Sequence, residues 1–257
     1  LANREIALGR YRRAAYIYAE LLGDFAAAAA ALQEGRYFRD AAVIYREKLK
    51  APLRAAECLE AGGLLAEAVP LYDQLLEHER AGDLLARLED QPAAEERWQR
   101  AVRQELSRSN RLQAARIQEH KLADPDSALK TLQEGWPSAV QAEACLEAEL
   151  QMYLRQPWAA IEKARLPELH SLTNQGSLQA PLVRLLVQHA HSHPDRQLSQ
   201  LAADQARHVV SAVLQQNQPE LQQQWVGFVG LAGGAEVLQQ KQPELQQQVL
   251  QHLGELD

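Results

Sequence analysis

Three tyrosines recur at a fixed interval of 27 residues and constrain the fold more than any other feature of this chain. They are Tyr18, Tyr45 and Tyr72. Each has an alanine four residues before it and a leucine four residues after it, a spacing that places all three side chains on one face of a helix. The alanines are Ala14, Ala41 and Ala68, and the leucines are Leu22, Leu49 and Leu76. We expect this stripe to face the core, with the small alanine allowing a neighbouring helix to approach closely.

A second, shorter helical segment separates successive copies of the stripe, at residues 24–35, 52–62 and 80–89. Gly35 and Gly62 close the first two, as glycine caps close many helices. Each 27-residue unit is therefore predicted to be a hairpin of two helices. One such hairpin cannot bury its own apolar face, whereas stacked hairpins can, so this period indicates a solenoid. The sequence predicts an all-α fold, a right-handed α-solenoid of antiparallel helical hairpins.

The composition agrees with helices throughout the chain. Good helix formers, namely Ala, Leu, Gln, Glu and Arg, dominate the 257 residues. Aromatic residues make up only 5%, and runs of Val, Ile and Thr, which favour strands, are missing. The hydrophobic share of 46% and the charged share of 24% are ordinary for a folded soluble protein.

The pattern weakens along the chain and changes near residue 166. Weaker copies of the hairpin extend to about residue 165, and Pro167, Asn174 and Gly176 then interrupt it. Glutamine becomes frequent afterwards, and helices are predicted at 178–192, 195–216, 219–240 and 243–255. We therefore expect two domains: a helical-repeat domain at 1–165, and a Gln-rich helical domain at 166–257 that forms a C-terminal bundle or cap.

The charge distribution argues against a nucleic-acid partner. Basic and acidic residues balance over 1–122, so the net charge of -7 falls in 123–257, and neither part is basic. No apolar run approaches the roughly 20 residues that span a bilayer, so no membrane association is expected. Two cysteines and no signal peptide favour the cytoplasm. Because the chain opens at Leu1 and its only methionine is Met152, we expect a piece of a longer protein.

No motif for catalysis or cofactor binding occurs in the sequence. Nucleophile elbows, phosphate-binding glycine loops and H-E-x-x-H are all missing. His189, His191 and His193 form H-x-H-x-H, in which the outer two lie one helical turn apart. No Cys, Asp or Glu nearby completes a set of three or four ligands, so no metal site is expected. The sequence therefore predicts no enzyme, no cofactor and no metal. Three tryptophans, Trp136, Trp158 and Trp225, are interpreted as core residues rather than interface anchors.

One helix of the hairpin resembles the second helix of a tetratricopeptide repeat. Gly9, Tyr11, Ala14 and Tyr18 match its pattern, and the second unit matches with one extra residue after Gly35. The units are shorter than the standard 34 residues, and the Trp-Leu-Gly-Tyr first helix is absent. Such short hairpins are also similar to clathrin-like and coat-protein solenoids. They resemble, too, the helical segments attached to β-propellers in bacterial MoxR-ATPase and von Willebrand A ternary systems. These resemblances imply protein binding and bring no catalytic residues.

The function that this reading favours is a non-catalytic scaffold that binds a partner protein or peptide along a helical-repeat surface. The predicted contact residues lie opposite the Ala-Tyr-Leu stripe or at its edge, and they are Arg10, Arg13, Arg39, Glu67 and Asp73. The alternative is a regulatory or adaptor segment of a larger enzyme or ATPase-linked machine whose active domain precedes residue 1. The sequence does not indicate an oligomeric state.

Overall fold

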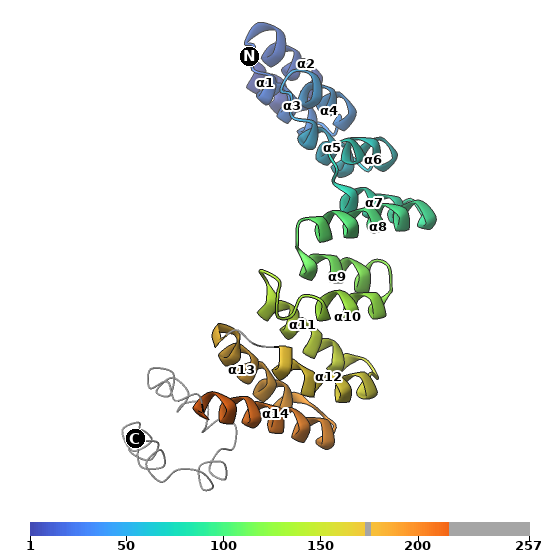
Figure 1. Cartoon of the computed structure of the whole chain (residues 1–257). Coiled ribbons are helices and arrows are strands. Elements are labelled where there is room, and N and C mark those ends of the chain that lie inside the picture. The colour runs from blue at the N-terminus through green and yellow to red at the C-terminus, as the bar shows by residue number, and fades with distance from the viewer. Residues whose placement is uncertain (173–175, 216–257) are drawn as a thin grey trace, which may run out of the picture. The chain divides into compact units, whose positions relative to one another are not determined.

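The computed structural model describes residues 1–172 and 176–215, and within those ranges every regular element is a helix (Figure 1). This confirms the all-α prediction for the described part of the chain. The helices predicted at 219–240 and 243–255, together with Trp225, lie outside it. No helix in the described ranges is both long and apolar enough to cross a membrane.

The chain divides into two compact units. Unit 1 spans Leu1–Arg108 and Arg116–Pro125, and unit 2 spans Ser109–Ala115 and Asp126–Asp257. The predicted boundary at 165/166 stays a prediction; it lies within a helix of unit 2, α12 (Ala159–Leu172).

Unit 1 is a succession of short helices in chain order (Figure 1). They are α1 (Ala2–Ala7), α2 (Tyr11–Tyr16) with a π-helical end η1 (Ile17–Leu21), α3 (Phe25–Glu34), α4 (Phe38–Glu47), α5 (Pro52–Ala61), α6 (Leu65–Gln74), α7 (His78–Arg87), α8 (Gln91–Ser107) and the second half of α9 (Arg111–His120). From α1 to α8, each helix contacts the next one. This arrangement is compatible with a helical-repeat fold, whereas the handedness and the antiparallel pairing stay predictions.

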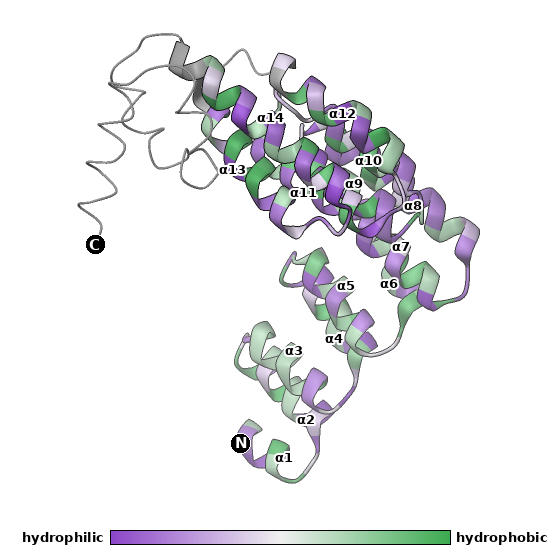
Figure 2. Cartoon of the chain, turned by 90° about the horizontal axis from the view of Figure 1, so that it is seen from below, coloured by the Kyte–Doolittle hydropathy of each residue, from purple (hydrophilic) through white to green (hydrophobic). Residues whose placement is uncertain are grey.

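The 27-residue period is visible in the structure of unit 1. Helices α2, α4 and α6 begin at residues 11, 38 and 65. Ala14, Ala41 and Ala68 are each 0% exposed, which confirms that this part of the predicted stripe faces the core. Figure 2 shows α3 as almost uniformly apolar, because its sequence is FAAAAAALQE.

The turns that precede α2, α4 and α6 share one backbone conformation. Gly9, Arg36 and Gly63, spaced by 27 residues, all have a left-handed φ between 61° and 74°. In the turn at Arg36, the Tyr37 N–H donates to the Leu32 carbonyl at 2.8 Å. This is the six-to-one bond of a Schellman cap, and the same bond recurs in the other two turns. Arg36 thus occupies the place of Gly9 and Gly63, so the extra residue that the sequence suggested after Gly35 is Arg36 itself.

Gly35 and Gly62 are the C-caps of α3 and α5, which confirms the prediction that they close these helices, but they are not the left-handed residues of the turns. Their φ values are -77° and -79°, which any residue adopts, and the next residue turns left-handed instead. Glycine occurs at these two positions because there is no space for a side chain. A Cβ on Gly35 would lie 2.5 Å from the Cβ of Tyr11, and a Cβ on Gly62 would lie 2.6 Å from the Cβ of Phe38.

The leucine of the predicted stripe does not close the core. Leu22 is 63% exposed and Leu76 is 60% exposed, while Leu49 is half-buried. Each follows the end of its helix, so the helical spacing from the alanine no longer applies; Leu76, for example, has a φ of 60°. The tyrosines do face inward, with Tyr72 fully buried and the other two half-buried.

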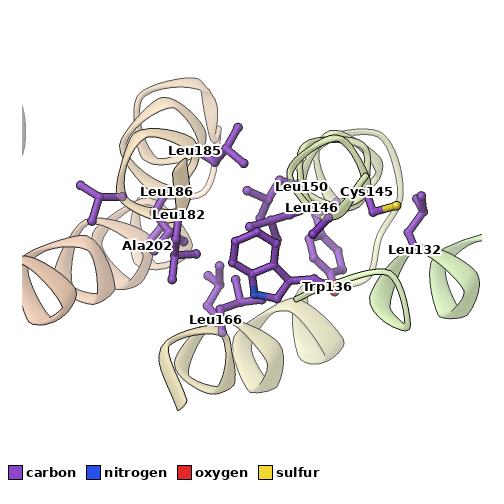
Figure 3. Close-up of a cluster of buried hydrophobic side chains, with 14 of the residues drawn as sticks. Leu132, Trp136, Cys145, Leu146, Leu150, Leu166, Leu182, Leu185, Leu186 and Ala202 are labelled. Carbon is purple, nitrogen blue, oxygen red and sulfur yellow. The ribbon is translucent and has the colours of Figure 1, made fainter. Parts of the chain in front are cut away.

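Unit 2 is built around a larger apolar core. Its helices are the first half of α9, α10 (Pro125–Gln133), α11 (Ala142–Arg155), α12, α13 (Gly176–Ser192) and α14 (Arg196–Gln215). Trp136 is 3% exposed and lies among leucines of α11, α12 and α13 (Figure 3). Its core prediction is confirmed, and Trp158 packs half-buried against the same cluster.

Candidate functional site

The structure pairs two of the five predicted contact residues directly. Arg39 on α4 binds Glu67 on α6, with its Nε 2.9 Å from Oε2. An equivalent pair lies one repeat earlier, where Arg12 on α2 donates from Nη2 to Asp40 on α4 at 2.9 Å. We call these two ion pairs the rungs, because they connect α2 to α4 and α4 to α6.

Both rungs lie at the surface. The Arg39 and Glu67 side chains are 65% and 42% exposed, and those of Arg12 and Asp40 are 67% and 46% exposed. The hydrogen bond from Arg39 lowers the pKa of Glu67, and the same bond raises the pKa of Arg39. Solvent screens such pairs strongly, so their main effect is to leave this face with little net charge.

The other three predicted residues have separate partners. Arg10 and Arg13 both lie 3.7 Å from Oε2 of Glu5. Asp73 accepts hydrogen bonds from Arg97 at 3.2 Å, a pair whose side chains are only 21% and 25% exposed. The five residues therefore belong to three separate groups of ion pairs, and their role as contact residues stays a prediction. Their partners could not be identified from the sequence, because helix contacts decide them.

Exposed apolar side chains lie beside the rungs at equivalent positions in two repeats. Tyr16 is 61% exposed and Val43 is 42% exposed, and they are 27 residues apart. Each follows the arginine of a rung by four residues, so it lies on the same face of its helix. We call this surface the rung face; it consists of Arg12, Tyr16, Arg39, Asp40, Val43 and Glu67.

A second polar cluster lies inside unit 2. Glu162 on α12 accepts a hydrogen bond from Nε2 of His189 on α13 at 2.6 Å. Its other oxygen is 3.3 Å from Nε2 of His193, which follows the end of α13. All three side chains are at most 5% exposed. The middle histidine of the motif, His191, is exposed and points elsewhere, as its spacing predicted.

Sequence reasoning missed Glu162 because it searched only near the histidines. The glutamate is 27 residues before His189, on a different helix, and no local pattern shows that these helices meet. The one feature that could have indicated Glu162 is that it is a charged residue on the side of α12 that faces the core.

Comparison of the chain with protein-family models, curated proteins and solved structures found no match. The function of the chain is therefore inferred from its own contacts alone.

Proposed function

We propose that this chain is a protein-binding scaffold and that the rung face of unit 1 receives the partner. The observation that carries the proposal is the recurrence of an exposed apolar residue, Tyr16 and then Val43, at the same place in consecutive repeats. Single exposed apolar residues are common on any protein. A periodic pair beside charged side chains is instead the arrangement of an interface, in which apolar anchors are surrounded by a polar rim.

The chemistry of the rung face favours a partner with an apolar anchor rather than a strongly charged one. Each arginine of the rungs already has a carboxylate at hydrogen-bond distance. A highly charged peptide would have to break these pairs, whereas an apolar side chain can settle between them and leave them intact. Tyr16 provides the larger contact, because tyrosine combines apolar area with a polar end.

Several finer features belong to the same proposal. The hairpins are antiparallel, the repeat is of the tetratricopeptide type, and the solenoid is right-handed. The protein works without a catalytic centre, in the cytoplasm. Its two cysteines, Cys58 and Cys145, support that compartment, because both are buried and free.

Affinity capture with the whole chain as bait tests the proposal. Wild type and the double variant Tyr16→Arg/Val43→Arg are compared on the same cell extract, with photo-crosslinking to identify direct contacts. Both substitutions are at exposed sites, so the fold is kept, which circular dichroism verifies. Leu53→Arg is the matched control, because Leu53 is 38% exposed and lies on α5, a helix that contributes no residue to the rung face.

We expect a protein that crosslinks to wild type and to the control at equal yield and is lost with the double variant. Raising the salt concentration should leave most of this binding in place, since the contact is mainly apolar. Equal capture by all three baits would reject the rung face as the binding surface. No specific crosslink to wild type would reject the scaffold role.

A further inference from the structure

We propose that Glu162, His189 and His193 form a binding site for a divalent metal ion of the zinc type. One carboxylate oxygen and two imidazole nitrogens, a possible ligand atom from each residue, lie within 4.8 Å of one another. The sequence had excluded a metal here because a third ligand was missing next to the histidines. The contact between α12 and the end of α13 supplies that ligand.

The donor set suits zinc. Imidazole nitrogens are borderline donors and a carboxylate oxygen is a hard one; Zn²⁺ binds both kinds at about 2.0–2.2 Å, in a tetrahedral arrangement. Ligand atoms around such an ion are roughly 3.3 Å apart. The distance of 3.3 Å from one carboxylate oxygen to Nε2 of His193 matches this value. The distance of 2.6 Å from the other oxygen to Nε2 of His189 is that of a hydrogen bond, so this pair must move apart when the ion binds. A fourth position remains for another ligand.

Burial makes the cluster unusual for a purely structural contact. Glu162 and His189 side chains are each 1% exposed, and a carboxylate is rarely buried without a positive charge beside it. A metal ion held by all three side chains would provide that charge.

The ring of His193 is already held in an orientation that suits ligation. Its Nδ1 lies 3.0 Å from the Asp195 N–H and 3.2 Å from the Asp195 carbonyl. With the proton on Nε2, Nδ1 accepts from the N–H; with a metal on Nε2, the proton moves to Nδ1 and is donated to the carbonyl. Such a bond to the second nitrogen is typical of metal-binding histidines.

His189 has no such bond at its second nitrogen in the described part of the chain. Its Nδ1 is buried and has no hydrogen-bond partner among the described residues, whichever nitrogen carries the proton. Its Nε2 forms a hydrogen bond with Glu162 and so directs the ring towards the cluster.

Titration with Zn²⁺ alone tests the proposal on the full chain after chelator treatment at pH 7.5. Isothermal titration calorimetry should show one saturable site per chain. Co²⁺ in place of Zn²⁺ should give the intense visible absorption of a tetrahedral site. His193→Gln, at the most exposed ligand, should weaken binding by more than about 100-fold, beyond the 10–100-fold typical of changes to outer partners. His191→Gln is the matched control and should bind as wild type does.

Two results would overturn the proposal. One is wild-type protein that shows no saturable Zn²⁺ binding and no Co²⁺ absorption, which would identify the cluster as a buried hydrogen-bonded triad. The other is binding that survives in both His193→Gln and Glu162→Gln, which would place the ion elsewhere. The Co²⁺ spectrum of the wild-type protein tests for the metal site even if the Glu162→Gln variant fails to fold.

Discussion

Gly62 lies so close to Phe38 that no side chain fits between them: a Cβ on the glycine would be 2.6 Å from the Phe38 Cβ. Gly35 meets Tyr11 in the same way one repeat earlier, at 2.5 Å. Since the backbone at both glycines suits any residue, the contact with the preceding helix is the reason for glycine. The 27-residue period of the sequence therefore reflects contacts between neighbouring helices as well as the conformation of each turn.

Gly62→Ala should lower the free energy of unfolding by about 1–3 kcal/mol, the usual cost of overpacking. Without the contact to Phe38, the same change would stabilise the protein by about 0.4–1 kcal/mol, because alanine restricts the conformations of the unfolded chain. Urea denaturation measures the difference. In a Phe38→Gly background, which removes the Phe38 Cβ, the loss should largely disappear. A stabilising Gly62→Ala in the wild-type background would show that α5 and α4 are further apart than described.

Arg36→Gly should stabilise the protein by about 0.5–1 kcal/mol. Arg36 has a φ of 61°, which is strained by roughly 1–2 kcal/mol for a residue with a Cβ, and glycine relieves this at some entropic cost. Thermal or urea denaturation checks the gain. Arg36→Ala keeps the strain and serves as the control, with no comparable gain. If both variants behave alike, the arginine side chain rather than the backbone decides the outcome.

Tyr72 should lose its proton late in an alkaline titration. Burial, followed by its hydrogen bond to Glu60, raises the pKa of Tyr72 to about 12. The folded state therefore holds the proton more tightly than the unfolded state, whose pKa is about 10. Stability should fall as the pH rises from about 10 through about 12. Tyr72→Phe should reduce this fall and remove the rise in absorbance at 295 nm near pH 12. Tyr16→Phe, at an exposed site, should change neither.

Arg165→Met should destabilise unit 2 by about 3–5 kcal/mol, because it leaves the carboxylate of Glu149 buried without its ion pair. Arg165 Nε is 3.1 Å from that carboxylate, and Glu149 is 0% exposed. The double variant Arg165→Met/Glu149→Gln should recover part of the loss in chemical denaturation. Arg184→Met is the control, since its pair with Glu143 is exposed and should contribute at most about 1 kcal/mol.

The destabilisation caused by Arg165→Met should depend on pH, in a direction that follows from the pKa of Glu149. Burial raises the pKa of Glu149 even with Arg165 present. Removing the arginine raises it further, so the folded state takes up a proton that the unfolded state releases near pH 4. The deficit of Arg165→Met should therefore be largest at neutral pH and shrink as the pH falls towards 5. A deficit that does not change with pH would show that lost packing, not charge, is the cause.

The helical repeat could be predicted from the sequence because close helix contacts demand small residues at fixed intervals. Ala14, Ala41 and Ala68 carry that signal and are fully buried. Leu22 and Leu76 misled the prediction, because helical spacing says nothing about where a helix ends. Those ends depend on left-handed turn residues, and Arg36 shows that such a residue need not be glycine.

The sites were less accessible to sequence reasoning. Arg39 and Glu67 were both chosen from their position on the helix, but nothing indicated that they bind each other. The Glu162 cluster was missed altogether, since its members come from two helices. Local spacing predicts which residues share a helix face, whereas a site needs the contacts between helices.

The left-handed turns at residues 9, 36 and 63 leave the chain in the same conformation after every 27 residues. A deletion of residues 37–63 would join Arg36 to Leu64, the residue that normally follows Gly63, so the junction would keep its backbone geometry. Insertion of a duplicated block would create an equally native junction. The length of this part of the chain can therefore change in multiples of 27 residues during evolution or engineering, and no new linker is needed for each change.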